Sequence, residues 1–130
     1  MIPATAAINY APVRRYIALA RPFTLLPPLL GIISGAVCAW GSAHNPDPSR
    51  QLTASVILTV ALGSLCASFL NAASNALNQI TDLEIDRINK PERPLVTGEL
   101  SIRQAWIFTW VMYVLAIVPK IGRAPCRERV

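Results

Sequence analysis

The sequence predicts an all-α fold, a polytopic bundle of transmembrane helices. Of the 130 residues, 53% are hydrophobic and 15% are charged, whereas about 25% charged residues are usual in soluble domains. The mean hydropathy is +0.43. The charged residues are also bunched, and they leave long uncharged stretches at 22–46, 51–81 and 104–119. We therefore expect three membrane-spanning helices.

Each uncharged stretch is long enough to supply most or all of a span, since a helix needs roughly 20 apolar residues to cross a bilayer. The spans are expected at about 22–40, 52–80 and 105–118. Pro27 and Pro28 are expected to kink the first helix, which membrane helices tolerate. Ser101 and Gln104 form the S-x-x-Q pattern typical of a capping box, so they predict the start of the third helix.

The net charge of +5 does not indicate nucleic-acid binding. Lys and Arg lie at the ends of apolar stretches, not on one soluble face, so we expect no nucleic-acid partner. The three cysteines, Cys38, Cys66 and Cys126, lack metal-ligand spacing. Because two of them lie within apolar spans, we expect buried free thiols and neither a disulfide framework nor a zinc site.

The chain divides into an N-terminal tail at 1–13, a membrane domain at 14–120 and a second tail at 121–130. The first tail lacks the pattern of a cleavable signal peptide. The second, IGRAPCRERV, concentrates three arginines after an apolar stretch. One back-translation of it resembles a widely used short-read sequencing adapter. We therefore expect this tail to be non-native and the chain to be an N-terminal fragment.

The positions of Lys and Arg predict the orientation in the membrane. Most lie before the first span and in the second loop, at Arg14, Arg15, Arg21, Arg87, Lys90, Arg93 and Arg103, whereas the first loop carries only Arg50. By the positive-inside rule the N terminus and the second loop face the cytoplasm. We expect a multi-pass protein of the cell inner membrane.

The second span carries a row of polar side chains at its cytoplasmic end. At about 100° per residue the row falls within an arc of roughly 80°, and its members are Asn71, Asn75, Asn78, Asp82 and Asp86. Carboxylates four residues apart on a helix repel each other, and carboxylates near a bilayer need a compensating charge or a water-filled cavity. A divalent cation would supply that charge.

Magnesium suits this arrangement because it takes one or two carboxylates and fills its remaining positions with water and substrate phosphates. We therefore expect a diphosphate ligand. Arg87, Lys90 and Arg93 follow directly and can neutralise phosphate oxygens. Glu84 falls on another side of the helix and is expected to be a solvated partner of a basic residue.

These residues carry a resemblance to a known family. The pattern Asn78-x3-Asp82-x3-Asp86, followed by RINKPERPLVTGELS, resembles the first aspartate-rich motif of the UbiA superfamily of intramembrane prenyltransferases. Its place at the cytoplasmic end of a second span, and the Arg21–Pro22 pair that opens the first span, agree with that family. The resemblance covers about residues 14–118.

The resemblance implies a larger helical bundle of about nine spans around a central cavity that holds a polyprenyl diphosphate. It also implies magnesium-dependent transfer of the prenyl group to an aromatic or lipid acceptor within the membrane. The family has a second aspartate-rich motif in its other half, which this chain lacks. The fragment is therefore expected to be inactive alone.

Residue by residue, the resemblance implies two groups of site residues. The catalytic and metal-binding residues would be Asn78, Asp82 and Asp86. The substrate-binding residues would be Lys90, Arg93, Arg21 and Asn75.

Other interpretations stay open. Asn71, Ser74 and Asn75 also fit interhelical hydrogen bonding. The alternative function is a fragment of a cation-coupled membrane transporter, although such a protein has no need of Lys90 and Arg93 beside its carboxylates. The acceptor is open among phenolic acids, homogentisate, chlorophyllide-like or haem-type rings and glycerophosphate lipids. The segment LNQITDLEIDRINKP resembles the homogentisate or glycerophosphate-lipid enzymes more closely than the hydroxybenzoate enzymes.

Overall fold

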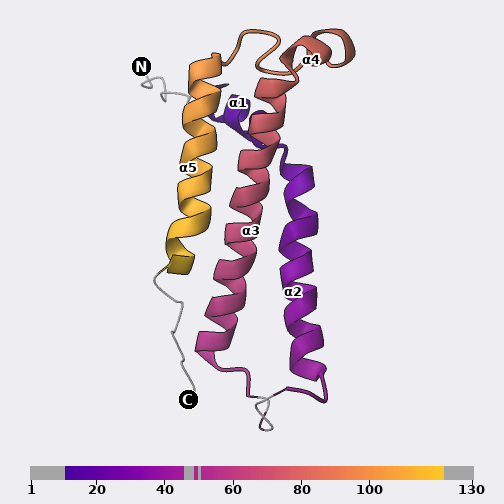
Figure 1. Ribbon diagram of the computed structural model, residues 1–130, viewed down its shortest axis with the longest axis vertical. Helices are drawn as coiled ribbons and strands as arrows, with labels where there is room; N and C mark the ends of the chain where they lie inside the picture. The colour runs from indigo at the N-terminus through magenta and orange to yellow at the C-terminus, as the bar shows by residue number, and fades with distance from the viewer. Residues whose placement is uncertain (1–10, 46–48, 50, 122–130) are drawn as a thin grey trace, which may run out of the picture.

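The computed structural model of the protein describes residues 11–45, 49 and 51–121, and every element in this part of the chain is helical (Figure 1). Three stretches are long and apolar enough to cross a membrane, at Pro22–Gly41, Ala54–Thr81 and Ile102–Pro119. The all-α fold class with three spans is therefore confirmed. The expected non-native tail lies outside the described residues, apart from Ile121 at the end of the last helix.

The first span is preceded by a separate short helix, and the helical path is interrupted between them at Arg21. We call this interruption the break. Helix α1 (Ala11–Ala20) is followed by a 3-10 turn, η1 (Pro22–Leu25), and then by α2 (Leu26–Gly41). Arg21 has a φ of 55°, in the left-handed region that residues other than glycine rarely adopt. Pro22 has no N–H and cannot continue the hydrogen bonding of α1.

The expected kink at Pro27 and Pro28 is wrong. Both prolines lie in the first turn of α2, where the backbone N–H groups have no partner within the helix and a proline costs little. The change of direction occurs instead at Arg21, six residues before Pro27.

Helix α3 (Ala54–Thr81) is the central element. Its 28 residues extend about 42 Å, and it lies between α2 and α5 and packs on both (Figure 1). The Thr53 hydroxyl caps its start by accepting a hydrogen bond from the Val56 N–H at 3.4 Å. Most of its buried residues are small, namely Ser64, Cys66, Ser68, Ala72, Ala73 and Ala76. Small side chains allow neighbouring helices to approach closely.

The cysteines differ in their surroundings. Cys66 is buried on α3 and Cys38 is exposed on α2, and both thiols are free. The expectation of buried free thiols is confirmed for Cys66 and wrong in burial for Cys38. Cys126 lies outside the described residues.

Helix α4 (Leu83–Asn89) follows α3 almost without interruption, and a loop then leads to α5 (Ile102–Ile121). The capping box predicted before α5 is confirmed. The Ser101 N–H donates to Oε1 of Gln104 at 2.9 Å, and the Gln104 N–H donates to Oγ of Ser101 at 3.2 Å.

Replacing the cap is expected to destabilise the fold measurably. Ser101→Ala removes the acceptor for the Gln104 N–H and should lower the free energy of unfolding by about 1 kcal/mol, measured by denaturant titration in detergent. Ser74→Ala is the matched control, because Ser74 is an exposed serine on α3, and it should change the free energy by less than about 0.5 kcal/mol. Equal effects of the two substitutions would contradict the role of the cap.

The main hydrophobic cluster of the described residues lies at the end of the bundle that carries α4. It joins α1, α3, the loop after α4 and α5, through Leu19, Ala76, Leu95, Leu100 and Ala105. The rings of Tyr16 and Phe108 stack beside it with centroids 5.8 Å apart. Nη1 of Arg15 donates to the Glu99 carbonyl at 3.3 Å. These contacts give the α4 end of the bundle a fixed framework.

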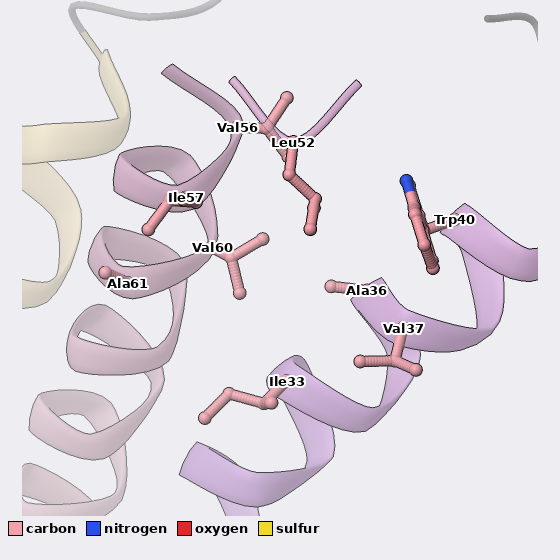
Figure 2. Close-up of a pocket in the computed structure, with 9 residues that line it drawn as sticks. All are labelled: Ile33, Ala36, Val37, Trp40, Leu52, Val56, Ile57, Val60 and Ala61. Carbon is pink, nitrogen blue, oxygen red and sulfur yellow. The ribbon is translucent and has the colours of Figure 1, made fainter. Parts of the chain in front are cut away.

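The opposite end holds an apolar hollow of about 390 Å³ between α2 and the start of α3. Figure 2 shows Ile33, Val37 and Trp40 of α2 facing it from one side and Val60 of α3 from the other. Its lining has no ionisable side chain. Catalytic groups must therefore be sought at the α4 end.

Candidate active site

The three residues of the predicted motif lie where α3 passes into α4. Asp82 closes α3 and opens α4, with φ −93° and ψ 15°. The backbone hydrogen bonds nevertheless continue from each residue to the fourth before it. The Asp82 N–H donates to the Asn78 carbonyl at 2.9 Å, and the Asp86 N–H donates to the Asp82 carbonyl at 2.8 Å. Asn78, Asp82 and Asp86 thus keep helical spacing although α4 bends away from α3 (Figure 1).

Asn78 and Asp82 are both exposed. Among the described residues no Lys, Arg or His forms an ion pair with Asp82, and its Oδ1 accepts only a weak hydrogen bond of 3.4 Å from the Thr81 hydroxyl. The Asp82 carboxylate is therefore available to a ligand.

Asp86 is in a different environment. It is 5% exposed, and its Oδ2 accepts a charge-assisted hydrogen bond from Nη1 of Arg93, so the two side chains form an ion pair. Turns in the loop place Arg93 there, since its own carbonyl accepts from the Val96 and Thr97 N–H groups, both at 2.9 Å. The sequence predicts that a divalent cation balances the negative charges of the motif. In the structure the Arg93 guanidinium balances the charge of Asp86.

The remaining cations of this region divide into paired and unpaired groups. Arg87 forms an exposed ion pair of 2.9 Å with Glu84, as expected for that glutamate. Lys90 is exposed at the end of α4, and Arg21 is exposed at the break between α1 and η1. Neither of these two side chains forms an ion pair or hydrogen bond with another described residue.

Asn75 is placed inside the bundle. Its Nδ2 donates to the Ala20 carbonyl at 3.0 Å and to the Thr24 hydroxyl at 2.7 Å. The neighbouring amide of Asn71 donates to the Thr24 carbonyl at 2.5 Å. Interhelical hydrogen bonding, the alternative interpretation of Asn71 and Asn75, is therefore what the contacts show, whereas Ser74 is exposed.

Gln79 and Thr24 were not among the residues predicted from the sequence. Gln79 is 2% exposed, and its Nε2 donates to the Leu19 carbonyl at 2.8 Å. The sequence did contain a signal, because Asn71, Asn75 and Gln79 are spaced by four residues and such residues share one side of a helix.

The oxygen donors of the motif fit part of a magnesium site. No cluster of three or more His, Cys, Asp or Glu able to hold a metal occurs in the described part of the chain. The free carboxylate of Asp82 and the exposed amide of Asn78 are oxygen donors of the type that Mg²⁺ uses, and Mg²⁺ commonly binds through one or two carboxylates together with water and phosphate. These residues fit one part of such a site.

These features define a helical membrane protein with a polar, partly charged site at one end of its bundle. The chain belongs to the UbiA prenyltransferase family, whose sequence model matches residues 25–119. This assignment favours a prenyltransferase over the transporter alternative.

Curated relatives agree. The chain is 30% identical over 114 residues to the digeranylgeranylglyceryl phosphate synthase of Methanococcus aeolicus. The aligned region covers 88% of this chain and 37% of the relative. The chain is 38% identical over 92 residues to the chloroplastic 2-acylphloroglucinol 4-prenyltransferase of Humulus lupulus, covering 68% of this chain and 20% of the relative. The chain thus spans between a fifth and two fifths of the length of these relatives. No solved structure matches it significantly.

Proposed function

We propose that this chain is part of an intramembrane enzyme that transfers a prenyl group from a polyprenyl diphosphate to an aromatic or lipid acceptor, with Mg²⁺ as cofactor. The observation that carries the proposal is the unpaired carboxylate of Asp82 beside Asn78 at the polar end of a UbiA family bundle. Lys90 caps the other end of α4, so a negative and a positive group free to bind a ligand flank one short helix.

The reaction can be written from the chemistry of the donor. The bond between C1 of the prenyl group and the diphosphate oxygen breaks, and its electron pair leaves with the diphosphate. A nucleophilic carbon or oxygen of the acceptor then forms a bond to C1 and loses a proton. Groups that stabilise the departing negative charge accelerate such a step.

The residues divide this work between them. Asp82 and Asn78 would supply oxygen ligands to Mg²⁺, which when bound neutralises the departing diphosphate as a Lewis acid. Lys90 and Arg21 would contact the diphosphate oxygens directly. Asp86 would stay paired with Arg93, and this ion pair would hold α4 and the following loop beside the metal ligands.

The names of the relatives suggest two classes of acceptor. One relative is named for a glyceryl phosphate lipid and the other for an acylphloroglucinol ring. We propose that the acceptor belongs to one of these classes. The arginines and lysines around the site further suggest that this end of the bundle and the N terminus face the cytoplasm.

Metal removal tests the proposed function. We expect the product of the full-length gene, in proteoliposomes with prenyl diphosphates of several chain lengths and a panel of both acceptor classes, to release diphosphate only with Mg²⁺. Excess EDTA should lower release to the level of protein-free vesicles, because the charge of the leaving group is then not neutralised, and added Mg²⁺ should restore it. Full activity in EDTA would contradict the metal dependence. No transfer with any donor length or acceptor would contradict the prenyltransferase itself.

A further inference from the structure

The break between α1 and α2 is held by a row of side-chain amides on α3. Asn71, Asn75 and Gln79 are each one helical turn apart, and each donates to a backbone carbonyl at the break, at distances of 2.5, 3.0 and 2.8 Å. Together with the Thr24 hydroxyl we name these groups the amide row. Asn75 and Gln79 are 8% and 2% exposed, so water does not compete for these bonds.

The break creates the need for these donors. The last carbonyl groups of a helix have no partner within it, and near the bilayer an unsatisfied carbonyl is costly. At the end of α1 the Leu19 carbonyl is satisfied by Gln79 and the Ala20 carbonyl by Asn75. The amide row thus allows the chain to leave the helix at Arg21.

One hydrogen-bond chain ends on Arg21 itself. Asn75 donates to the Thr24 hydroxyl at 2.7 Å, and this hydroxyl donates to the Arg21 carbonyl at 2.8 Å. Arg21 has the left-handed conformation, with φ 55°, which is unfavourable for a residue with a Cβ and persists only where its surroundings impose it. The amide row supplies those surroundings.

The position of the break relates it to the proposed site. Asn75 lies seven residues before Asp82, about 10 Å along the helix axis, and its contact with Ala20 places Arg21 beside this part of α3. The Arg21 side chain is exposed and has no partner among the described residues, so its guanidinium is free to bind an anion. The conformation of the Arg21 backbone determines where that guanidinium can reach.

We propose that the amide row is a positioning device for Arg21, which holds it in the left-handed conformation and so directs its guanidinium toward the diphosphate of the prenyl donor. Thr24, Asn71, Asn75 and Gln79 are then positioning residues and do not touch the substrate. The inference rests on the proposed function and adds to it the way in which the first span is coupled to the donor site.

A double-mutant cycle in the full-length enzyme tests the coupling. Thr24→Val keeps the shape of the side chain but removes the hydroxyl between Asn75 and Arg21, and it should raise the KM for the prenyl diphosphate about tenfold, within the range of coupled pairs. In an Arg21→Ala background the same substitution should change this KM less than about twofold, because no guanidinium remains to be positioned. Thr24→Ser restores the hydroxyl and should recover most of the affinity.

Controls separate positioning from stability. Thr59→Val removes a hydroxyl that donates to the Ser55 carbonyl at 2.7 Å on α3, the helix that carries the three amides, but far from the site. It should leave the KM unchanged. If Thr24→Val does not accumulate as folded protein, Gln79→Met, which removes the donor to Leu19 at similar length, takes its place in the cycle.

The outcomes are distinct. A loss of affinity that disappears in the Arg21→Ala background and is restored by Thr24→Ser supports the proposal. Independent effects of the two substitutions, or no rescue by serine, would overturn it while prenyl transfer by the unmodified enzyme persists. An unmodified enzyme without prenyl transfer would overturn the proposed function and this inference with it.

Discussion

Asp82→Asn in the full-length enzyme is expected to lower the rate of prenyl transfer about a hundredfold to a thousandfold, the loss typical of removing one group that stabilises charge in a transition state. The substitution keeps the size of the side chain and removes its negative charge. Asp82 is exposed and has no cationic partner among the described residues, so the change should not disturb the fold. The measurement is diphosphate release under saturating Mg²⁺ and donor.

Glu84→Gln is the matched control for this experiment. Glu84 is a second exposed carboxylate two residues away, and it is paired with Arg87 at 2.9 Å. It should retain the rate of the unmodified enzyme within about twofold, because weak surface ion pairs contribute little. A similar loss in both variants would show that general surface charge, and not the Asp82 carboxylate, governs the rate.

The fold was predictable because the membrane imposes simple rules on a sequence. A stretch of some 20 uncharged residues has few alternatives to a spanning helix, and the structure accordingly places its spans at Pro22–Gly41, Ala54–Thr81 and Ile102–Pro119. The capping box at Ser101 was predictable for a similar reason. Its hydrogen bonds join residues three apart and depend on no distant part of the chain.

The break at Arg21 was not predictable from local sequence. The three prolines at 22, 27 and 28 are all able to interrupt a helix, and the sequence alone does not say which of them does so. The choice depends on carbonyl acceptors at the break meeting amide donors about 50 to 60 residues away, such as Gln79 for Leu19. Helical spacing indicated that Asn71 and Asn75 share a face, but not which partners that face meets.

The candidate site shows the same division. The spacing of Asn78, Asp82 and Asp86 was evident in the sequence, and their catalytic and metal-binding roles stay predictions. Their unequal surroundings were not evident, because the loop that returns Arg93 to Asp86 depends on tertiary turns. Two carboxylates that look equivalent in the motif thus become one free group and one paired group.

That pairing leads to the second large expected effect. Arg93→Met keeps the aliphatic stem and removes the charge, which leaves the buried Asp86 carboxylate without its partner. Removing one member of a buried ion pair costs about 3–5 kcal/mol, and we expect the free energy of unfolding of the full-length protein in detergent to fall by that amount. Arg87→Met breaks an exposed pair whose side chains are 57% and 81% accessible, and it should cost no more than about 1 kcal/mol.

A double variant identifies the cause of that loss. If the uncompensated charge of Asp86 is responsible, adding Asp86→Asn to Arg93→Met should recover much of the lost stability, because an amide is far less costly to bury than a carboxylate. If instead the Arg93 guanidinium holds the loop against α4 whatever the charge of Asp86, the second substitution should recover nothing. A loss in Arg93→Met no larger than in Arg87→Met would show that another group compensates the charge of Asp86. A cation bound beside Asp82 would be the first candidate, and repeating the titration with and without Mg²⁺ would test it.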